Sequence, residues 1–135
     1  MEIKEKKPII YTAFSKHYFY ARMLISAYVL EKDCIPLNPF TNWEYFMNDM
    51  VHRDLVARGN YNLILLAEEI WVFGPIADGV YEEIKMAHAM GKYVRYYSLG
   101  KKLEDIDGVE IKEIEFEKEL FEKYTKEEIE KEIWA

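Results

Sequence analysis

Residues 69–92 read EIWVFGPIADGVYEEIKMAHAMGK, and this stretch decides the fold class. The apolar run Glu69–Gly74 predicts a strand, and Val80–Met90 predicts a helix after a short turn. Gly91 suits the position just after a helix, and Lys92–Leu99 (KYVRYYSL) predicts the next strand. A strand, a helix and a second strand in this order are typical of two parallel strands joined by a helical crossover.

The chain before this stretch shows the same alternation. Pro8–Phe14 (PIIYTAF) predicts a first strand, buried on both faces, and Cys34–Leu37 predicts a short second strand. Ser15 suits the N-cap of a helix between them that ends near Lys32. Apolar residues at helical spacing define one face of this helix: Tyr20, Met23, Leu24, Ala27 and Leu30.

A third helical region precedes the strand at Glu69. Thr41 and Glu44 have the spacing of a capping box, which predicts a helix from Asn42 to about Ala57. Residues 58–60 (RGN) predict a break, and residues 60–67 a short helix that leads into the strand.

The acidic tail, Lys101–Ala135, carries 7 Lys and 13 Asp plus Glu, so most of the net charge of −7 lies in it. Apolar and acidic residues alternate over Val109–Phe116 (VEIKEIEF), which predicts an edge strand. Thr125 and Glu128 form a second capping-box pattern and predict a last helix. Two interpretations stay open: the tail docks on the body as a strand and helix, or it offers its charges to a partner.

We therefore expect one α/β domain over residues 1–135, with the acidic segment 101–135 as its C-terminal part. The expected fold is a flavodoxin-like or Rossmann-like three-layer sandwich with a mostly parallel sheet of about four to five strands.

The composition excludes several classes of protein. Half of the 135 residues are hydrophobic and only Cys34 is a cysteine, so we expect a core without disulfides or a cysteine-based zinc cluster. The net charge of −7 argues against general nucleic-acid binding. No apolar run approaches the roughly 18–20 residues that cross a bilayer. Met1–Lys7 is too polar for a signal peptide, so we expect a cytoplasmic protein. Many Lys and Glu with few Gln are typical of thermophiles.

The expected ligand site lies at the carboxyl ends of the strands, where open α/β sheets bind ligands. The sequence lacks the glycine-rich dinucleotide and P-loop motifs and the GxSxG motif of many hydrolases. Gly79, without a Cβ, lets a ligand approach the backbone, and Glu83 follows about one helical turn later on the same face. Glu82 points about 100° away. The alternative is that these acids only complement the dipole of the helix.

Three stretches of the chain resemble the nucleoside 2-deoxyribosyltransferase-like superfamily, including an uncharacterised branch of small proteins with that fold. Tyr11-Thr12-Ala13 resembles the Tyr-x-Ala that ends the first strand of the family. Glu69-Ile70-Trp71-Val72-Phe73-Gly74 resembles the Asp-Glu-x-Trp-Val-Phe-Gly strand of the uncharacterised branch. Gly79-x-x-x-Glu83-Ile84-x-x-Ala87-x-x-x-Gly91-Lys92 resembles the signature Gly-x-x-x-Glu-(Leu/Ile)-Gly-x-Ala-x-x-x-Gly-Lys.

The resemblance implies roles for several residues. Glu83 corresponds to the catalytic glutamate, which attacks the anomeric carbon and forms a glycosyl-enzyme intermediate, as in a retaining glycosidase. Tyr11 corresponds to the tyrosine that orients this glutamate through a hydrogen bond. Gly79 corresponds to the glycine beside the sugar, and we include the adjacent Asp78 among the substrate-binding residues.

The chain departs from the family pattern at two places. Lys85 stands where the family has a glycine, two residues after the glutamate. The aspartate that handles the leaving base has two candidate equivalents, Asp54 and Asn60; we favour Asp54 because it follows Arg53, and because an asparagine cannot be a general acid.

Related nucleotide N-hydrolases bind a 5′-phosphate with the loop after the first strand. Ser15, Lys16 and His17 could do this at a helix N-terminus. In the alternative interpretation Ser15 only caps the helix and Lys16 is solvated.

The leading functional hypothesis is cleavage of the N-glycosidic bond of a nucleoside or nucleoside 5′-monophosphate, without metal or cofactor. The expected partners are this small molecule and a second copy of the chain, since family members form dimers or higher oligomers; neither nucleic acid nor membrane is expected. A second hypothesis is a non-catalytic nucleotide-binding or sensing module. A third is an interaction protein that works through its acidic tail.

Overall fold

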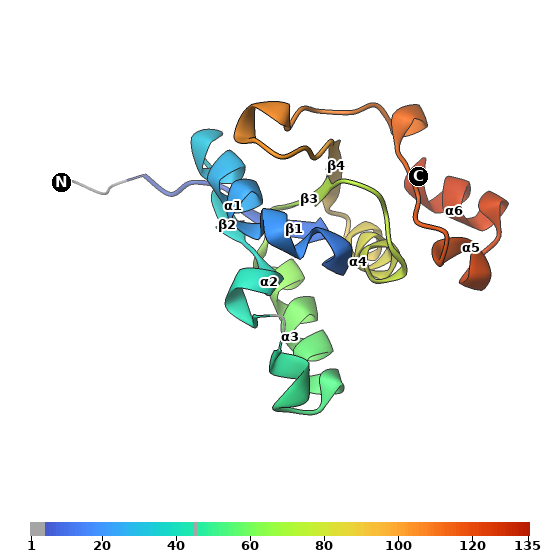
Figure 1. Cartoon of the computed structure of the whole chain (residues 1–135), viewed down its shortest axis with the longest axis horizontal. Coiled ribbons are helices and arrows are strands. Elements are labelled where there is room, and N and C mark those ends of the chain that lie inside the picture. Colours follow the sequence, from blue (N-terminus) through green and yellow to red (C-terminus); the bar gives the residue numbers. More distant parts are fainter. Residues whose placement is uncertain (1–4, 45) are drawn as a thin grey trace.

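The computed structural model describes residues 5–44 and 46–135 (Figure 1). Four strands form one sheet in the order β2-β1-β3-β4, and every pair is parallel. They are β1 (Ile9–Phe14), β2 (Ile35–Leu37), β3 (Glu69–Phe73) and β4 (Tyr93–Tyr97). The predicted α/β fold with parallel strands is therefore confirmed, and the strand ends that should form a ligand site share one edge of the sheet.

Helices cover both faces of this sheet. They are η1 (Lys16–Ala21), α1 (Arg22–Glu31), α2 (Pro39–Asn42), η2 (Met47–Asp49), α3 (Arg53–Leu66), α4 (Asp78–Ala89), η3 (Leu103–Asp105), η4 (Ile111–Glu113), α5 (Leu120–Lys123) and α6 (Lys126–Ile133). None of the helices that the structure describes is long and apolar enough to span a membrane.

Successive side chains of β1 point to opposite faces of the sheet, so they pack into two separate cores. Ile10 and Phe14 pack with Ile25 and Val29 of α1 on one face of the sheet. Tyr11 and Ala13 point to the opposite face, where α3, α4 and the end of the tail pack. Tyr11 is therefore placed toward α4 by the period of the strand.

The predicted helix Asn42–Ala57 is wrong. Asn38 caps a shorter helix, α2, by accepting hydrogen bonds from the backbone of Phe40 and Thr41, with Pro39 at its first position. Glu44 adopts a positive φ of 57°, which ends helical geometry there, so Thr41 and Glu44 form no capping box.

The predicted break at residues 58–60 is also wrong, because α3 continues through it. A Cβ on Gly59 would lie 2.6 Å from Cζ2 of Trp43. The glycine is therefore explained by the indole ring that covers the helix, and not by a turn. The same indole Nε1 donates a hydrogen bond to Asn60 Oδ1 at 2.7 Å.

The tail docks on the body, as one of the two interpretations expected, but the predicted edge strand Val109–Phe116 is wrong. The 3-10 helix η4 interrupts it, and in the described part of the chain the tail pairs only through isolated bridges, Tyr97 with Gly108 and Ile76 with Phe116. The capping box of Thr125 and Glu128 is confirmed at the start of α6. In Figure 1 the tail passes over the sheet and then lies along α4.

The apolar face expected on the first helix points only partly to the core. Met23 is 74% exposed, and Tyr20 and Leu30 are also exposed, while Leu24 packs against the core. The residues that α1 buries are Ile25 and Val29, on the other side of the helix. An apolar stripe that the fold leaves uncovered is a candidate surface for contact with another molecule.

Candidate functional site

The centre of the candidate site is a contact between Tyr11 and Glu83. Tyr11 lies in the middle of β1 and is fully buried, and Glu83 lies on the second turn of α4. The Tyr11 hydroxyl donates a short hydrogen bond to Glu83 Oε2. Residues 72 positions apart in the sequence are thus brought together, as the family resemblance implies.

Burial changes the protonation of both groups. It raises the pKa of the Glu83 carboxyl to about 7, although the hydrogen bond from Tyr11 acts in the opposite direction. Burial, together with the negative charge of Glu83, raises the pKa of Tyr11 well above its usual range. Glu83 is therefore poised between its acid and carboxylate forms near neutral pH, while Tyr11 stays a hydrogen-bond donor. A carboxyl group in this state can act as a nucleophile or as an acid–base group.

The start of α4 leaves space beside Gly79. A Cβ added at Gly79, one turn before Glu83, would meet no heavy atom within 4 Å beyond its chain neighbours and the backbone of its own helix. Glu83 itself is a partly buried residue of the next turn. A small ligand could therefore approach the backbone at Gly79, one turn before the residue that carries the carboxyl group.

The acidic tail borders this open surface. Lys123 Nζ lies 2.5 Å from Asp78 Oδ2 at the first residue of α4. The hydrogen bond from Lys123 is the main reason that the pKa of Asp78 is lowered. Asp78, predicted to bind substrate, is thus held in an ion pair with the tail.

Glu82 and Glu83 point to different partners, as the helical spacing predicts. Glu82 Oε1 accepts a short hydrogen bond from the Tyr124 hydroxyl and lies 3.0 Å from Lys85 Nζ. Burial raises the pKa of Glu82, but these two donors outweigh it and the pKa is lowered. Lys85 also lies over the rings of Tyr81 and Tyr124. Lys85 therefore contacts the tail.

Neither Asp54 nor Asn60, the two candidates for handling the leaving base, lies with the Tyr11–Glu83 pair. Asp54 lies in the first turn of α3 with its side chain 82% exposed and 3.6 Å from His52. In Figure 1 this end of α3 projects away from α4. Asn60 lies further along α3, where its amide oxygen accepts the hydrogen bond from Trp43. The structure assigns a leaving-group role to neither residue.

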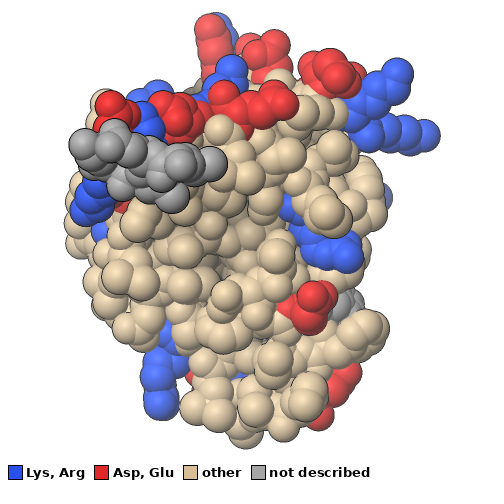
Figure 2. Space-filling view, turned by 90° about the vertical axis from the view of Figure 1, so that its left-hand side faces the viewer, with Lys and Arg blue, Asp and Glu red and all other residues tan. Residues whose placement is uncertain are grey.

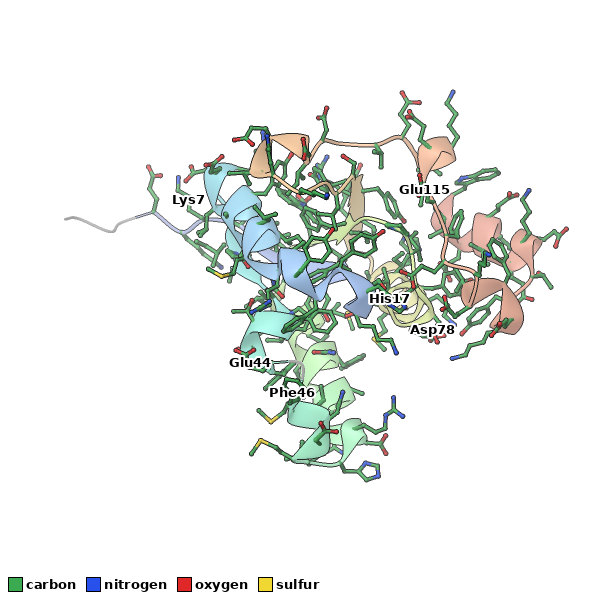
Figure 3. The ribbon with its side chains drawn as sticks, in the orientation of Figure 1. Lys7, His17, Glu44, Phe46, Asp78 and Glu115 are labelled. Carbon is green, nitrogen blue, oxygen red and sulfur yellow. The ribbon has the colours of Figure 1, made fainter. Side chains whose placement is uncertain are left out.

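The structure of the loop after β1 agrees with the sequence-based expectation only in part. Ser15 is buried and caps η1, since its side chain accepts a hydrogen bond from the backbone of His17 at 3.2 Å. Lys16 is exposed, and His17 Nε2 faces Glu117 at 3.7 Å. Figure 3 shows His17 near the start of α4, where Asp78 is labelled. The capping interpretation of Ser15 is thus confirmed, while phosphate binding by this loop stays a prediction.

Sequence reasoning missed Lys123 and Tyr124. Both lie about forty positions after their partners on α4. The capping box at Thr125 indicates only that a helix begins there. No local pattern indicates which surface that helix covers. The placement of Lys123 and Tyr124 beside Asp78 and Glu82 could therefore not be predicted.

A family model described as "Domain of unknown function (DUF7768)" matches residues 11–97, from Tyr11 in β1 to the end of β4. A search of curated proteins finds no match. The family match includes Glu83 and leaves out the acidic tail. Because it spans well over half of the 135 residues, the chain belongs to the DUF7768 family.

Proposed function

We propose that this protein cleaves the N-glycosidic bond of a nucleoside or a nucleoside 5′-monophosphate, by hydrolysis or by transfer to a second base, and that it is related to the nucleoside 2-deoxyribosyltransferase-like superfamily. The observation that carries the proposal is the partly buried hydrogen bond from Tyr11 to Glu83, one helical turn after the open backbone of Gly79. Glu83 lies on the helix that follows the carboxyl end of β3, the end of the strands at which parallel α/β sheets bind ligands.

In the proposed reaction, an oxygen of ionised Glu83 attacks the anomeric carbon of the sugar. The bond from this carbon to the base nitrogen breaks, and the base leaves with the electron pair and takes up a proton. Water or a second base then displaces the Glu83 ester and regenerates the carboxylate. Tyr11 holds the carboxylate oxygen in position through both steps. Carboxylate, tyrosine and water suffice, so the proposal requires no metal or cofactor.

The direct test is release of free base from a panel of nucleosides and nucleoside 5′-monophosphates, followed by chromatography. The proposal expects release from at least one member of the panel. The preferred member would show whether the 5′-phosphate contributes to recognition. No release from any member, with or without an acceptor base, would leave the proposal without support.

One observation favours a second candidate, a non-catalytic nucleotide-binding module. A catalyst gains from an acid that protonates the leaving base, but Asp54 is exposed on the projecting end of α3. A binding module needs no such acid. Nucleotide-dependent thermal stabilisation without turnover, unchanged in Glu83→Ala, would favour this candidate.

Replacing Tyr11 by Phe removes the hydroxyl that donates to Glu83 and keeps the ring. Because this hydrogen bond lowers the pKa of Glu83, its loss should raise that pKa above about 7. The proposed reaction needs ionised Glu83, so its rate rises with pH through the pKa of Glu83. The rising limb of the pH–rate profile should therefore move to higher pH in the variant. Below the limb the rate falls about tenfold for each unit that the pKa rises. A limb at the wild-type position would contradict the assigned role of Tyr11.

The proposed partner is a second copy of the chain. Most of the exposed large apolar residues lie between Tyr20 and Leu66. Figure 2 shows the side of the molecule that carries α1, β2 and α2, where charged side chains gather at the top and few lie over the middle. Exposed apolar patches of this kind are typical of protein interfaces. We therefore propose a homodimer that buries this surface.

Charge placed on this surface should separate the dimer. Met23 and Leu30 are 74% and 57% exposed, and they lie on one face of α1 because seven residues make about two turns. The double variant Met23→Glu, Leu30→Glu is expected to sediment as a monomer, while the wild type sediments as a dimer. Phe121→Glu, at an exposed position in the tail, is the control and should stay dimeric. A monomeric wild type in analytical ultracentrifugation would refute this proposal.

A further inference from the structure

A group of metal-ligating side chains lies outside the Tyr11–Glu83 pair, between the loop after β1 and the acidic tail. His17 contributes an imidazole from η1, and Glu117 and Glu119 contribute carboxylates from the tail. One ligand atom from each residue lies within 4.8 Å of the other two. We propose that His17, Glu117 and Glu119 form a binding site for a divalent transition-metal ion such as Zn²⁺.

The backbone fixes the two segments that carry these donors. Ser15 caps η1 by bonding to the backbone N–H of His17, which sets the start of this helix. On the tail side, Ile76 N–H donates to Glu115 O at 2.9 Å, and Glu117 N–H donates to Ile76 O at 3.0 Å. The loop after β3 thus holds the Glu115–Glu117 segment next to the loop after β1. In Figure 3, Glu115 marks the part of the tail that leads toward α5, and His17 lies near the start of α4.

The surroundings of Glu117 also favour binding of a cation. Its side chain is only 13% exposed, yet among the described residues its carboxylate has a single oppositely charged neighbour, His17, at 3.7 Å. That separation is longer than a hydrogen bond, and His17 carries a charge only when protonated. Carboxylates that are largely shielded from water are normally paired or bound to a metal. A cation held with His17 would give the Glu117 carboxylate a closer oppositely charged partner.

The distances suit coordination better than direct pairing. Zn²⁺ binds imidazole nitrogen and carboxylate oxygen at about 2.0–2.2 Å, which sets neighbouring ligand atoms about 3–3.5 Å apart. The 3.7 Å between His17 Nε2 and Glu117 Oε1 is close to this value. Glu119 is exposed, so its side chain can adjust to complete the set without a change of the backbone.

The same residues line a hollow of about 550 Å³ on the surface, together with Tyr18, Pro75 and Glu115. A metal held by three protein donors has further coordination positions, and the hollow has room for water or an anion in them. Three carboxylates line this hollow against Lys118, so its charge favours a cation over the bare phosphate expected for this loop. The mixed nitrogen and oxygen donors favour a transition metal over Mg²⁺, which prefers oxygen.

The test is calorimetric titration of the full-length, metal-free protein with Zn²⁺ alone and with Mg²⁺ alone. We expect one Zn²⁺ per chain and much weaker binding of Mg²⁺. His17→Ala and Glu117→Gln should each weaken Zn²⁺ binding at least about tenfold. Even residues that only support metal ligands change metal affinity by about 10–100-fold when they are replaced. Circular dichroism should show that both variants are folded.

His52→Ala is the matched control. His52 also lies beside a carboxylate, Asp54 at 3.6 Å, but no second carboxylate completes a group of three among the described residues. Its replacement should leave Zn²⁺ affinity unchanged. If His17→Ala binds Zn²⁺ as tightly as wild type, or if Mg²⁺ binds equally well, the ion is attracted only by the general charge of the acidic tail and the proposal is overturned. Because no substrate is present, this result is independent of the proposed glycosidic cleavage.

Discussion

Replacing Glu83 by Gln is expected to lower the rate of base release by about 10⁴-fold or more, which is the size of effect seen when an enzyme loses its nucleophile. The amide of Gln is nearly the same size as the carboxyl group and can still accept a hydrogen bond from the Tyr11 hydroxyl. It cannot attack the anomeric carbon, so the covalent intermediate does not form. The measurement is chromatographic detection of the free base under single-turnover conditions with the best substrate of the panel.

Glu82→Gln is the matched control for this prediction. Glu82 is the adjacent carboxylate of the same helix, but it bonds to Tyr124 and Lys85 on the tail side. Its replacement should change the rate only a few-fold, because the helix turns it about 100° away from Glu83. If both variants lose the same activity, or if Glu83→Gln keeps it, Glu83 is not the nucleophile.

Measuring the stability of the Glu83→Gln variant separates a chemical cause of the expected loss of activity from a structural one. The folded protein raises the pKa of Glu83 from 4.5 to about 7, so between these values the native state binds a proton that the unfolded state has lost. The wild type should therefore lose stability as pH rises from about 5 to 8. Glu83→Gln has no group to ionise there, so relative to wild type it should become more stable over this range. Thermal unfolding at the two pH values measures the difference.

The parallel sheet could be predicted because its strands are short apolar runs between helical patterns. Glu69–Phe73 is bounded by Gly74, and α4 ends before Gly91, and both glycines adopt the positive φ that such boundaries often need. These signals are local. The spacing of Gly79 and Glu83 is local too, so the face of α4 that carries the carboxyl group could also be derived.

The errors arose where tertiary contacts override local signals. Gly59 resembles a helix break, but the indole of Trp43 lies on it and the helix continues. Val109–Phe116 alternates like a strand, but the tail crosses the edge of the sheet instead of joining it. The face of Tyr20, Met23 and Leu30 has helical spacing, but periodicity alone cannot tell a core from a surface that another molecule covers.

The acidic tail is also where the sequence is least informative about function. Its charges suggest an independent interaction segment, while its apolar residues complete the core. Leu120, Ile129 and Ile133 are almost fully buried with α4 and β4, and Ile106 is buried with α1. Burying one such side chain contributes about 1.5–3 kcal/mol, so these four together contribute about 6–12 kcal/mol. That is comparable to the whole stability of a small domain, about 5–15 kcal/mol.

Deleting residues 101–135 is therefore expected to abolish cooperative unfolding of the remaining chain, measured by circular dichroism during heating and in urea. A single substitution tests the same point in the full chain: Leu120→Ala should lower the free energy of unfolding by about 2–5 kcal/mol, because it leaves a cavity in a fully buried position. Phe121→Ala, at the adjacent position that is 48% exposed, should cost less than about 1 kcal/mol. A truncated chain that still unfolds cooperatively at the wild-type temperature would show that the tail is a separable segment. That result would support the hypothesis of an interaction protein, because the charged tail could then bind a partner without being needed for folding.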